Sequence, residues 1–390
     1  MKEYSVQTFN FHIGDQKIPC HIGYDCIEEL IEVIEGFQFD MLMVGFDEHS
    51  YYHHGEWLLS ALKKADIPHF NCMIPAGETN KTWKTLDYIL STLILGECTR
   101  STMVLAFGGG MVDNIFGMAA GLLYRGIRLI YFPTTFLSAH DSVTSQKQAV
   151  NHSGYKNIVG LYHPPSAIIC DTRVMSTIGS HNIKSGLAEL VKNGIIFGGE
   201  FHDAIDEKLT TNRELDFSGG SLAKLIGLGI KAKQEIVKHD PREKTISVIL
   251  EYGHTIGHAI ELTCPDGEMT HGEAIAIGML AASFIANKMH LMTDADRKKH
   301  DELIEKLDLQ LPLLHDAAFN KIWERVHKDN KRGYIPERKG FVPMVLLKKI
   351  GEPHRRNVQG MEYAPEAIVE DAIHFVLSKF QPKPTPLMAS

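Results

Sequence analysis

The chain has 390 residues, enough for two domains with separate hydrophobic cores. It contains 44% hydrophobic and 23% charged residues and carries a net charge of −8 at pH 7, as an ordinary soluble globular protein does. This acidic balance, without a long basic stripe, argues against nucleic-acid binding, and no apolar run is long enough for a membrane helix. The opening segment MKEYSVQTFNFHIGD lacks the apolar core of a signal peptide.

The cysteines indicate a reducing compartment. There are six of them, with no CxxC pair: Cys20, Cys26, Cys72, Cys98, Cys170 and Cys264. Scattered thiols favour reduced cysteines over a disulfide framework or a thiolate zinc site. We therefore expect a cytoplasmic protein.

The first half of the chain alternates short apolar strands with amphipathic helices. Four segments are expected to form buried parallel strands: 41–46, 102–107, 127–132 and 166–170. The stretch TWKTLDYILSTLILG (82–96) has the amphipathic pattern of a helix between such strands. The alternation predicts an α/β nucleotide-binding layer of the Rossmann type.

The second half is helical in pattern from about residue 180. The turn-like segment DTRVMSTIGSHN (171–182) separates the two halves. We predict an NAD-binding α/β domain over residues 1–178 and a mainly α-helical, metal- and substrate-binding domain over residues 179–390.

Three consecutive glycines, Gly108 to Gly110, follow a predicted strand and precede a helix that we expect to begin near Asn114. Glycines in this context let the backbone approach a pyrophosphate, which then lies at the helix N-terminus. A tight turn without a ligand is the alternative. Asp47, just after the strand at 41–46, is a candidate for binding a ribose hydroxyl.

The segment EYGHTIGHAIEL (251–262) places His254 and His258 on one face of a predicted helix. Glu189 and His271 offer further ligand atoms. Carboxylate and imidazole ligands without thiolate suit zinc or cobalt in a catalytic site. Two core histidines would show the same spacing, so spacing alone leaves both interpretations open.

Basic residues recur beside glycines and asparagines along the chain. They include Arg125, Lys147, Lys156, Lys192, Lys233 and the run 329–332. Each one alone is typical of a solvated surface, whereas together they could bind a phosphate.

Taken together, these motifs resemble the dehydroquinate synthase superfamily of sugar-phosphate cyclases over nearly the whole chain. The similar stretches are GETNKT (77–82), GGGMVDN (108–114), YRGIRLIYFPTTFLSAHDSVTSQKQAVN (124–151), KNIVG (156–160), GLAELVKNG (186–194), EYGHTIGHAIE (251–261) and HGEAIAIGM (271–279). Within the superfamily the chain is most similar to the 2-deoxy-scyllo-inosose synthases. The resemblance implies a dehydroquinate synthase-like fold and a phosphate-eliminating carbon–oxygen lyase that uses NAD and one divalent metal, Co²⁺ or Zn²⁺.

The resemblance also implies roles for individual residues. The metal ligands fall on Glu189, His254 and His271, and His258 would face the substrate as a proton relay. The NAD contacts fall on Glu78, Lys81, Gly109, Gly110, Thr134 and Thr135, to which Asp141 is added as a position shared with the substrate. The substrate and phosphate positions fall on Lys147, Asn157, Lys192, Lys233 and Lys331. Arg125 matches an arginine that reaches into the neighbouring subunit's site, which implies a homodimer.

Two departures from the dehydroquinate synthases bear on the substrate. Those enzymes have an arginine where this chain has Ser247 and an asparagine where it has Glu251, and both help to hold a substrate carboxylate. Losing one partner of a buried charge pair costs about 3–5 kcal/mol, so a carboxylate substrate is disfavoured. A neutral polyol suits Ser247 and Glu251, because a carboxylate accepts hydroxyl hydrogen bonds.

The implied reaction converts D-glucose 6-phosphate to 2-deoxy-scyllo-inosose, the carbocycle of 2-deoxystreptamine aminoglycosides. Oxidation at C4 by NAD acidifies the C5 proton, phosphate leaves, C4 is reduced again, and an aldol step closes the ring. His258, Lys147, Lys192 and Lys233 are the catalytic candidates in this scheme, with Glu251 as an alternative base.

Other functions remain as alternatives. A 3-dehydroquinate synthase or a sedoheptulose 7-phosphate cyclase would share most of these motifs. A glycerol dehydrogenase-like enzyme would share the two-domain plan but has no use for a phosphate cluster. A non-catalytic homologue is disfavoured, because the metal-ligand positions and Lys147, Lys192 and Lys233 are intact.

Overall fold

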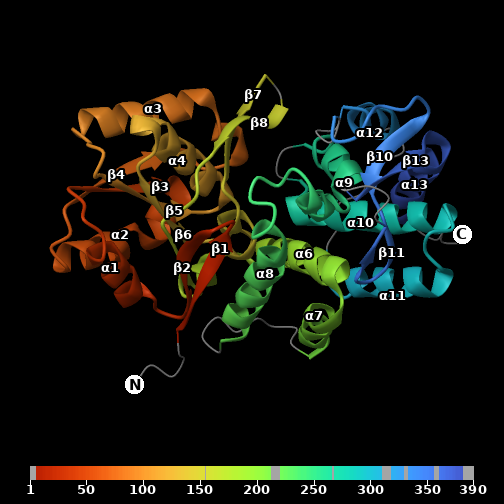
Figure 1. Ribbon diagram of the computed structural model, residues 1–390, viewed down its shortest axis with the longest axis horizontal. Coiled ribbons are helices and arrows are strands. Elements are labelled where there is room, and N and C mark those ends of the chain that lie inside the picture. The colour runs from red at the N-terminus through yellow and green to blue at the C-terminus, as the bar shows by residue number, and fades with distance from the viewer. Residues whose placement is uncertain are drawn as a thin grey trace, which may run out of the picture. The chain divides into compact units, whose positions relative to one another are not determined.

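The computed structural model describes residues 6–153, 155–211, 220–265, 268–309, 318–328, 333–354 and 360–380. The chain divides into two compact units (Figure 1). The first comprises residues 1–183 with 214–242, and the second comprises residues 184–213 with 243–390. Among the described residues, no helix is both long and apolar enough to cross a membrane.

The first unit is built on a seven-stranded sheet with the strand order β1-β2-β9-β6-β5-β3-β4. Its strands are β1 (Gln7–Ile13), β2 (Gln16–Gly23), β3 (Leu42–Asp47), β4 (His69–Ile74), β5 (Met103–Gly108), β6 (Arg128–Pro133) and β9 (Ala167–Asp171). All neighbouring strands pair in parallel except the hairpin β1–β2. The four predicted strands are confirmed as β3, β5, β6 and β9, each displaced by about one residue. They could be predicted because buried parallel strands are continuous apolar runs.

Helices cover both faces of this sheet. They are α1 (Ile27–Glu35), α2 (Glu48–Lys64), α3 (Trp83–Leu95), α4 (Gly110–Leu122), α5 (Phe136–His140) and α8 (Ser221–Val237). Figure 1 shows α1 and α2 on the opposite face from α3 and α4. A separate antiparallel hairpin consists of β7 (Lys147–His152) and β8 (Tyr155–Tyr162) and packs against α4.

The start of α4 differs from the expectation. The helix begins at Gly110 and not near Asn114. Glycine has low helix propensity, which hides such a start in the sequence. A larger residue at position 109 would clash with its neighbour, because a Cβ on Gly109 would lie 2.9 Å from Thr135 Cγ2.

The division into units also differs from the expected boundary at 178/179. The first unit ends at Ile183, and residues 214–242 return to it. These residues include α8, whose apolar face packs on β1 and β2. The sequence pattern shows that α8 is amphipathic but not which core it covers.

The second unit is mainly helical, as predicted. Its helices are α6 (Ser180–Phe197), which begins just before the boundary, α7 (Gly199–Thr211), α9 (His254–Glu261), α10 (His271–Lys288), α11 (Asp294–Glu305), α12 (Phe319–Val326) and α13 (Glu366–Lys379). Two small antiparallel pairs complete it: β10 (Phe341–Val345) with β13 (Met361–Pro365), and β11 (Leu347–Lys349) with β12 (Glu352–Pro353).

Helix α10 is the core of the second unit and packs against α9, α11 and α13. Glycines let α9 and α10 approach closely. A Cβ on Gly278 would lie only 1.9 Å from the carbonyl oxygen of Gly253, which itself has a φ of +78°. This close approach fixes the positions of the first residues of both helices.

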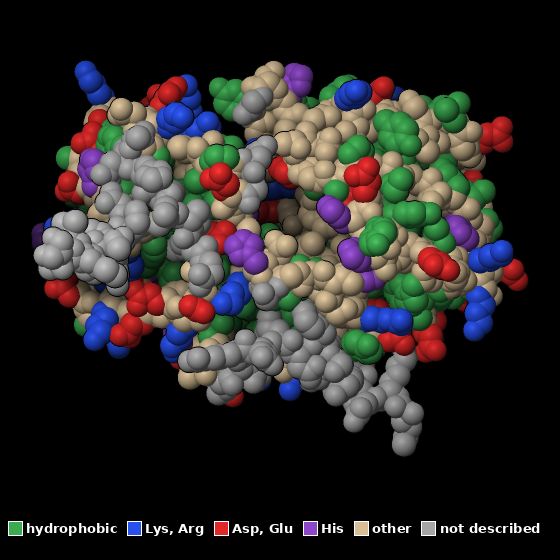
Figure 2. Space-filling view, turned by 180° about the vertical axis from the view of Figure 1, so that it is seen from behind, with side chains coloured by type: hydrophobic (Ala, Val, Ile, Leu, Met, Phe, Trp, Pro, Cys, Tyr) green, Lys and Arg blue, Asp and Glu red, His purple; other side chains and the backbone are tan. Residues whose placement is uncertain are grey.

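The surface carries charges of both signs. On the face shown in Figure 2, Lys and Arg side chains are scattered among Asp and Glu side chains. This mixture fits the modest net charge of −8.

Candidate active site

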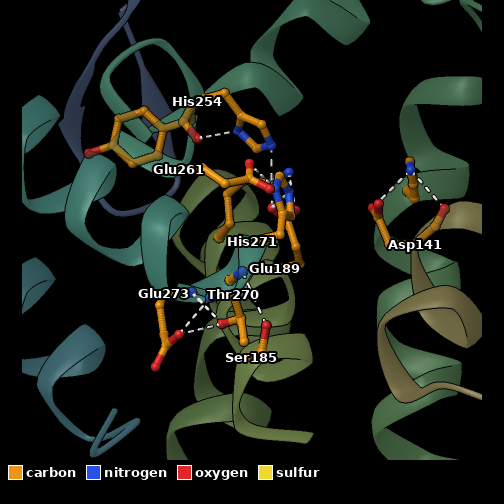
Figure 3. Close-up of polar contacts among 12 residues, drawn as sticks. Asp141, Ser185, Glu189, His254, Glu261, Thr270, His271 and Glu273 are labelled. Atoms are coloured by element: carbon orange, nitrogen blue, oxygen red, sulfur yellow. Dashed lines mark hydrogen bonds and ion pairs between the residues drawn. The ribbon is translucent and has the colours of Figure 1, made fainter. Parts of the chain in front are cut away.

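Side chains from three helices of the second unit meet at the carboxylate of Glu189 (Figure 3). Glu189 lies on α6 and is 1% exposed, whereas His254 and His271 are the first residues of α9 and α10. Glu189 Oε1 lies 3.3 Å from His254 Nε2 and 3.5 Å from His271 Nε2. Lys192, one turn further along α6, forms an ion pair with Glu189 Oε2.

These distances suit a divalent cation. Tetrahedral zinc has bonds to nitrogen and oxygen of about 2.0–2.1 Å, which places neighbouring ligand atoms about 3.3–3.4 Å apart. The two distances from Glu189 Oε1 are close to that value. Ring nitrogens of His254, His258 and His271 all lie within 4.8 Å of one another. His258 therefore belongs to the same cluster, as an additional ligand or as a neighbour.

The cluster sets the charge of its own members. Burial would raise the pKa of Glu189, but the Lys192 ammonium and the His254 imidazole outweigh it and hold that pKa well below its ordinary value. Burial would lower the pKa of His271, but hydrogen bonds to Glu189 and Glu261 raise it to about 10. Glu189 and Glu261 thus favour a positive charge beside His271. A divalent cation bound there would supply that charge in place of the proton.

The imidazoles of His254 and His271 are each oriented by a partner at the other nitrogen. His254 Nδ1 lies 3.0 Å from the carbonyl oxygen of Tyr252. Because a carbonyl can only accept, Nδ1 carries the proton and Nε2 faces Glu189. His271 Nδ1 lies 3.2 Å from Glu261 Oε2, so a carboxylate orients this ring in the same way. Such partners fix the tautomer of metal-binding histidines.

The start of α10 is fixed by further hydrogen bonds (Figure 3). Thr270 and Glu273 form a capping box around the first turn, and Ser185 Oγ accepts a hydrogen bond of 3.1 Å from Gly272 N. The capping box fixes the first turn that carries His271, and the hydrogen bond to Ser185 joins this turn to α6, which carries Glu189.

In the first unit, the glycine turn between β5 and α4 forms a cradle. Cβ atoms on Gly109 and Gly110 would lie 2.9 Å from Thr135 Cγ2 and 3.0 Å from Ser142 Oγ. Thr134 N donates to Gly108 O at 2.7 Å, which keeps the next strand end close. The N–H groups of a first helical turn bind phosphate, so this turn is a candidate pyrophosphate site.

Asp47 lies at the same edge of the sheet, at the end of β3. Its side chain accepts a hydrogen bond of 2.7 Å from Ser50 N in a capping box of α2. One carboxylate oxygen therefore serves the helix N-terminus.

A polar cluster surrounds the buried Lys81, which is 4% exposed. Lys81 Nζ donates to Asn157 Oδ1 at 2.6 Å and lies 3.9 Å from Glu78 Oε1. Asn151 connects the same residues, because it accepts from Asn157 N at 2.9 Å and donates to Glu78 Oε1 at 3.0 Å. Burial lowers the pKa of Lys81. The structure thus joins NAD candidates, Glu78 and Lys81, to a phosphate candidate, Asn157.

A partly buried ion pair joins two predicted residues of the first unit. Lys233 Nζ, on α8, lies 2.8 Å from Asp141 Oδ1 and 2.9 Å from the Asp141 carbonyl oxygen. The lysine is 6% exposed. This pair ties α8 to the turn that follows α5.

The chain is similar to known proteins over most of its length. Family models described as 3-dehydroquinate synthase N-terminal and C-terminal match residues 71–185 and 186–332. A 2-deoxy-scyllo-inosose synthase of Niallia circulans is 36% identical over 372 residues, which cover 95% of this chain and 97% of that protein. The chain belongs to the dehydroquinate synthase family.

Other members of the family extend this result. A 2-deoxy-scyllo-inosose synthase of Streptoalloteichus tenebrarius is 33% identical over 94% of this chain and 95% of its own. A crystal structure of a 2-deoxy-scyllo-inosose synthase complexed with carbaglucose-6-phosphate, NAD⁺ and Co²⁺ has a TM-score of 0.86 and 32% identity, and covers 95% of this chain and 99% of its own. A probable glycerol dehydrogenase of Sinorhizobium meliloti, at 13% identity with a TM-score of 0.59 over 96% of this chain and 98% of its own, shares the fold alone.

The other predicted site residues have the following places in the chain. Arg125 and Lys147 are exposed in the first unit. Arg125 follows Tyr124 in a turn where both have positive φ, of 67° and 53°. In the second unit, Glu251 ends a short 3₁₀ helix, Ile246–Glu251, just before His254. Lys331 lies outside the described residues.

Sequence reasoning missed several partners of the predicted residues. Asn151 and Glu261 lie inside motifs that resemble the family, but neither is among the predicted site residues. The hydrogen bond that the Tyr252 carbonyl accepts from His254 could not be predicted from sequence, because every residue has a backbone carbonyl. Asp113, in the first turn of α4, is 1% exposed and accepts a hydrogen bond from Ser138 Oγ. Burial raises the pKa of Asp113 well above its ordinary value, which favours a neutral carboxyl beside the glycine turn.

Proposed function

We propose that the protein is a carbocyclase that converts D-glucose 6-phosphate to 2-deoxy-scyllo-inosose and phosphate, with NAD and one divalent metal, in 2-deoxystreptamine aminoglycoside biosynthesis. The observation that carries this proposal is the placement of two imidazole nitrogens 3.3 and 3.5 Å from one oxygen of Glu189. Inosose synthases with 36% and 33% identity over nearly the whole chain support it.

Glu189, His254 and His271 would hold the metal. Their oxygen and nitrogen donors fit Co²⁺ or Zn²⁺. When bound, the metal supplies Lewis-acid polarisation of substrate hydroxyls. Lys192 balances the charge of Glu189 through Oε2, and His258 would accept a hydroxyl proton. Glu251 is the alternative base.

The glycine turn and the polar cluster of the first unit would bind NAD. The proposed contacts are Asp47, Glu78, Lys81, Gly109, Gly110, Thr134, Thr135 and Asp141. When bound, NAD would supply reversible hydride transfer for a transient oxidation of substrate C4, with no net use of the cofactor. The hydrogen bonds of Lys81 and Asn157 pre-position their side chains before the ligand arrives.

Basic residues would hold the phosphate group. Arg125, Lys147, Asn157 and Lys331 are the proposed contacts, and Lys233, which is paired with Asp141, is a further candidate. A phosphate carries its charge on several oxygens, so distributed lysines and arginines stabilise it as it leaves. The reaction makes the protein a carbon–oxygen lyase.

Ser247 and Glu251 favour a polyol over a carboxylate substrate. Both belong to the 3₁₀ helix Ile246–Glu251, and Ser247 is 2% exposed. A substrate carboxylate near Glu251 would be repelled, because like charges in a site of low dielectric raise the free energy of binding. Glucose 6-phosphate carries hydroxyls at the corresponding end.

We also propose a cytoplasmic homodimer. All six cysteines are free thiols, which fits a reducing compartment. The exposed Arg125, in its strained turn, is the residue proposed to reach the partner subunit. Sedimentation of the purified protein tests the dimer, and Arg125→Ala should lower phosphate release without dissociating it.

Phosphate release from different substrates tests the main proposal. Purified protein with NAD and Co²⁺ should release phosphate from glucose 6-phosphate, form a carbocyclic ketone and accumulate no NADH. Release only from the seven-carbon acid phosphate of dehydroquinate synthases would contradict the roles of Ser247 and Glu251. Release only from sedoheptulose 7-phosphate would assign the chain to that group of cyclases, and stoichiometric NADH would favour an alcohol dehydrogenase.

A further inference from the structure

A buried hydrogen-bonded chain runs through the second unit behind the histidine cluster. Tyr252 Oη lies 2.9 Å from His300 Nε2, and His300 Nδ1 lies 2.8 Å from Asp301 Oδ1. Tyr252 and His300 are both 0% exposed. Ser283 Oγ donates to Asp301 Oδ1 at 2.7 Å, and Arg297 Nε lies 3.4 Å from Asp301 Oδ2.

The chemistry of these groups determines which atom donates and which accepts in each of these hydrogen bonds. The Asp301 carboxylate can only accept, so His300 Nδ1 carries a proton. His300 Nε2 is then the acceptor, and the Tyr252 hydroxyl donates to it. Matched donors and acceptors from Tyr252 through His300 to Asp301 hold these three side chains in one arrangement.

Tyr252 connects this chain to the proposed metal site through its backbone. Its carbonyl oxygen accepts the hydrogen bond from His254 Nδ1 at 3.0 Å. On its C-terminal side, the carbonyl of Gly253 abuts Gly278, where a Cβ would come within 1.9 Å. The Tyr252 carbonyl is therefore held by its own side chain and by the close packing of α9 on α10.

Packing alone does not require the hydroxyl. A phenylalanine at position 252 would fill almost the same volume, but His300 would then lose a partner in a fully buried position. The fixed position of an acceptor matters at His254, because a partner at one imidazole nitrogen sets the orientation of the other.

We propose that Tyr252, His300 and Asp301 form a positioning relay that fixes the Tyr252 carbonyl and thereby orients His254 for metal binding. This inference rests on the proposed metal site. The three residues touch neither metal nor substrate, so they act through His254 and are not catalytic.

Metal affinity of the purified protein tests the relay. Co²⁺ would be titrated by its visible absorption into the unaltered protein and into Tyr252→Phe. Tyr252→Phe should weaken Co²⁺ binding about 10-fold and shift the Co²⁺ absorption bands, because His254 is less well oriented. Tyr363→Phe is the matched control: it removes another tyrosine hydroxyl of the second unit, which donates to Pro336 O, and should leave the affinity unchanged.

A pair of substitutions at His300 separates orientation from stability. In His300→Gln the amide reaches the position of Nε2 and can still accept from Tyr252. In His300→Asn the amide reaches the position of Nδ1 and keeps only Asp301. His300→Asn should therefore weaken Co²⁺ binding as Tyr252→Phe does, and His300→Gln should weaken it less, even where both lower the melting temperature equally.

Three outcomes would count against these ideas in distinguishable ways. Failure of the unaltered protein to bind Co²⁺ would contradict the metal site itself. Normal binding by Tyr252→Phe, beside normal binding by the unaltered protein, would overturn the relay alone. Equal losses of affinity in His300→Gln and His300→Asn, in proportion to lost stability, would reduce the relay to a structural role and overturn the inference.

Discussion

Glu189 illustrates how a single residue depends on its surroundings. Its carboxylate is 1% exposed, yet it stays charged because Lys192 and two imidazoles surround it. An isolated buried carboxylate would be neutral instead. The neighbours that keep Glu189 charged also orient its carboxylate, with Oε1 toward His254 and His271. The same contacts therefore determine both the charge and the orientation of this side chain.

Substituting Glu189 by Gln should remove metal binding while preserving the shape of the side chain. The amide carries no charge, so the buried ion pair with Lys192 is broken, which destabilises the protein by about 3–5 kcal/mol. Co²⁺ affinity should fall by at least about 100-fold, with phosphate release abolished. Co²⁺ titration and chemical unfolding measure the two effects. Glu200→Gln, at an exposed position on α7, should change neither, and retention of Co²⁺ affinity in Glu189→Gln would refute the ligand assignment.

Asp113 should make the stability of the protein depend on pH. Its pKa in the folded protein is raised by burial, so its contribution to stability is greatest below the unfolded pKa of about 3.9. That contribution is lost as the pH rises through the folded pKa. The unfolding free energy of the unaltered protein minus that of Asp113→Asn should therefore decrease as the pH rises above the unfolded pKa of about 3.9.

Urea unfolding at several pH values measures this difference. Asp87→Asn removes an exposed carboxylate on α3 and should give a nearly flat curve. A difference that increased with pH would mean that Asp113 is charged in the folded protein and paired with Lys81.

At the scale of elements, the contact between α9 and α10 places His254 and His271 on neighbouring helix N-termini. Gly278→Ala should force these helices apart, because the new Cβ would meet Gly253 O at 1.9 Å. We expect a loss of about 1–3 kcal/mol in the free energy of unfolding and weaker Co²⁺ binding. Gly179→Ala is the control, since no atom lies within 4 Å of its Cβ. A fully stable Gly278→Ala would show that the helices can separate freely.

The elements differ in how far sequence alone predicts them. β3, β5, β6 and β9 follow from their apolar runs, whereas the start of α4 at Gly110 contradicts glycine's helix propensity and depends on the close approach of Thr135. The resemblance to a family names Glu189, His254 and His271, but spacing alone could not, because α6, α9 and α10 meet only after folding. The Tyr252 carbonyl and the relay behind it depend on backbone position, which no residue pattern encodes.

At the scale of the whole molecule, the two units should respond to different ligands. NAD should slow amide hydrogen exchange around the glycine turn and α4, and Co²⁺ should slow it in α9 and α10. A ligand concentration of about 100 times the dissociation constant stabilises the unit that binds it by about 2.7 kcal/mol. This is enough to slow exchange about 100-fold at amides that exchange only when that unit unfolds. Mass spectrometry of peptides reads out each region. With Glu189→Gln, the Co²⁺ effect should vanish while the NAD effect remains, and protection by NAD in α9 alone would contradict the assignment.

The path of the chain between the units has a consequence for synthesis. The polypeptide leaves the first unit at Ile183, within α6, and then completes α6 and α7. Residues 214–242 return to the first unit, and the rest of the chain belongs to the second. A nascent chain therefore cannot cover β1 and β2 until α8 has emerged from the ribosome, with α6 and α7 already made. Any fragment that stops at Ile183 would expose an apolar sheet face to aggregation. A free-standing nucleotide-binding fragment would have to be assembled from two separate pieces of the gene.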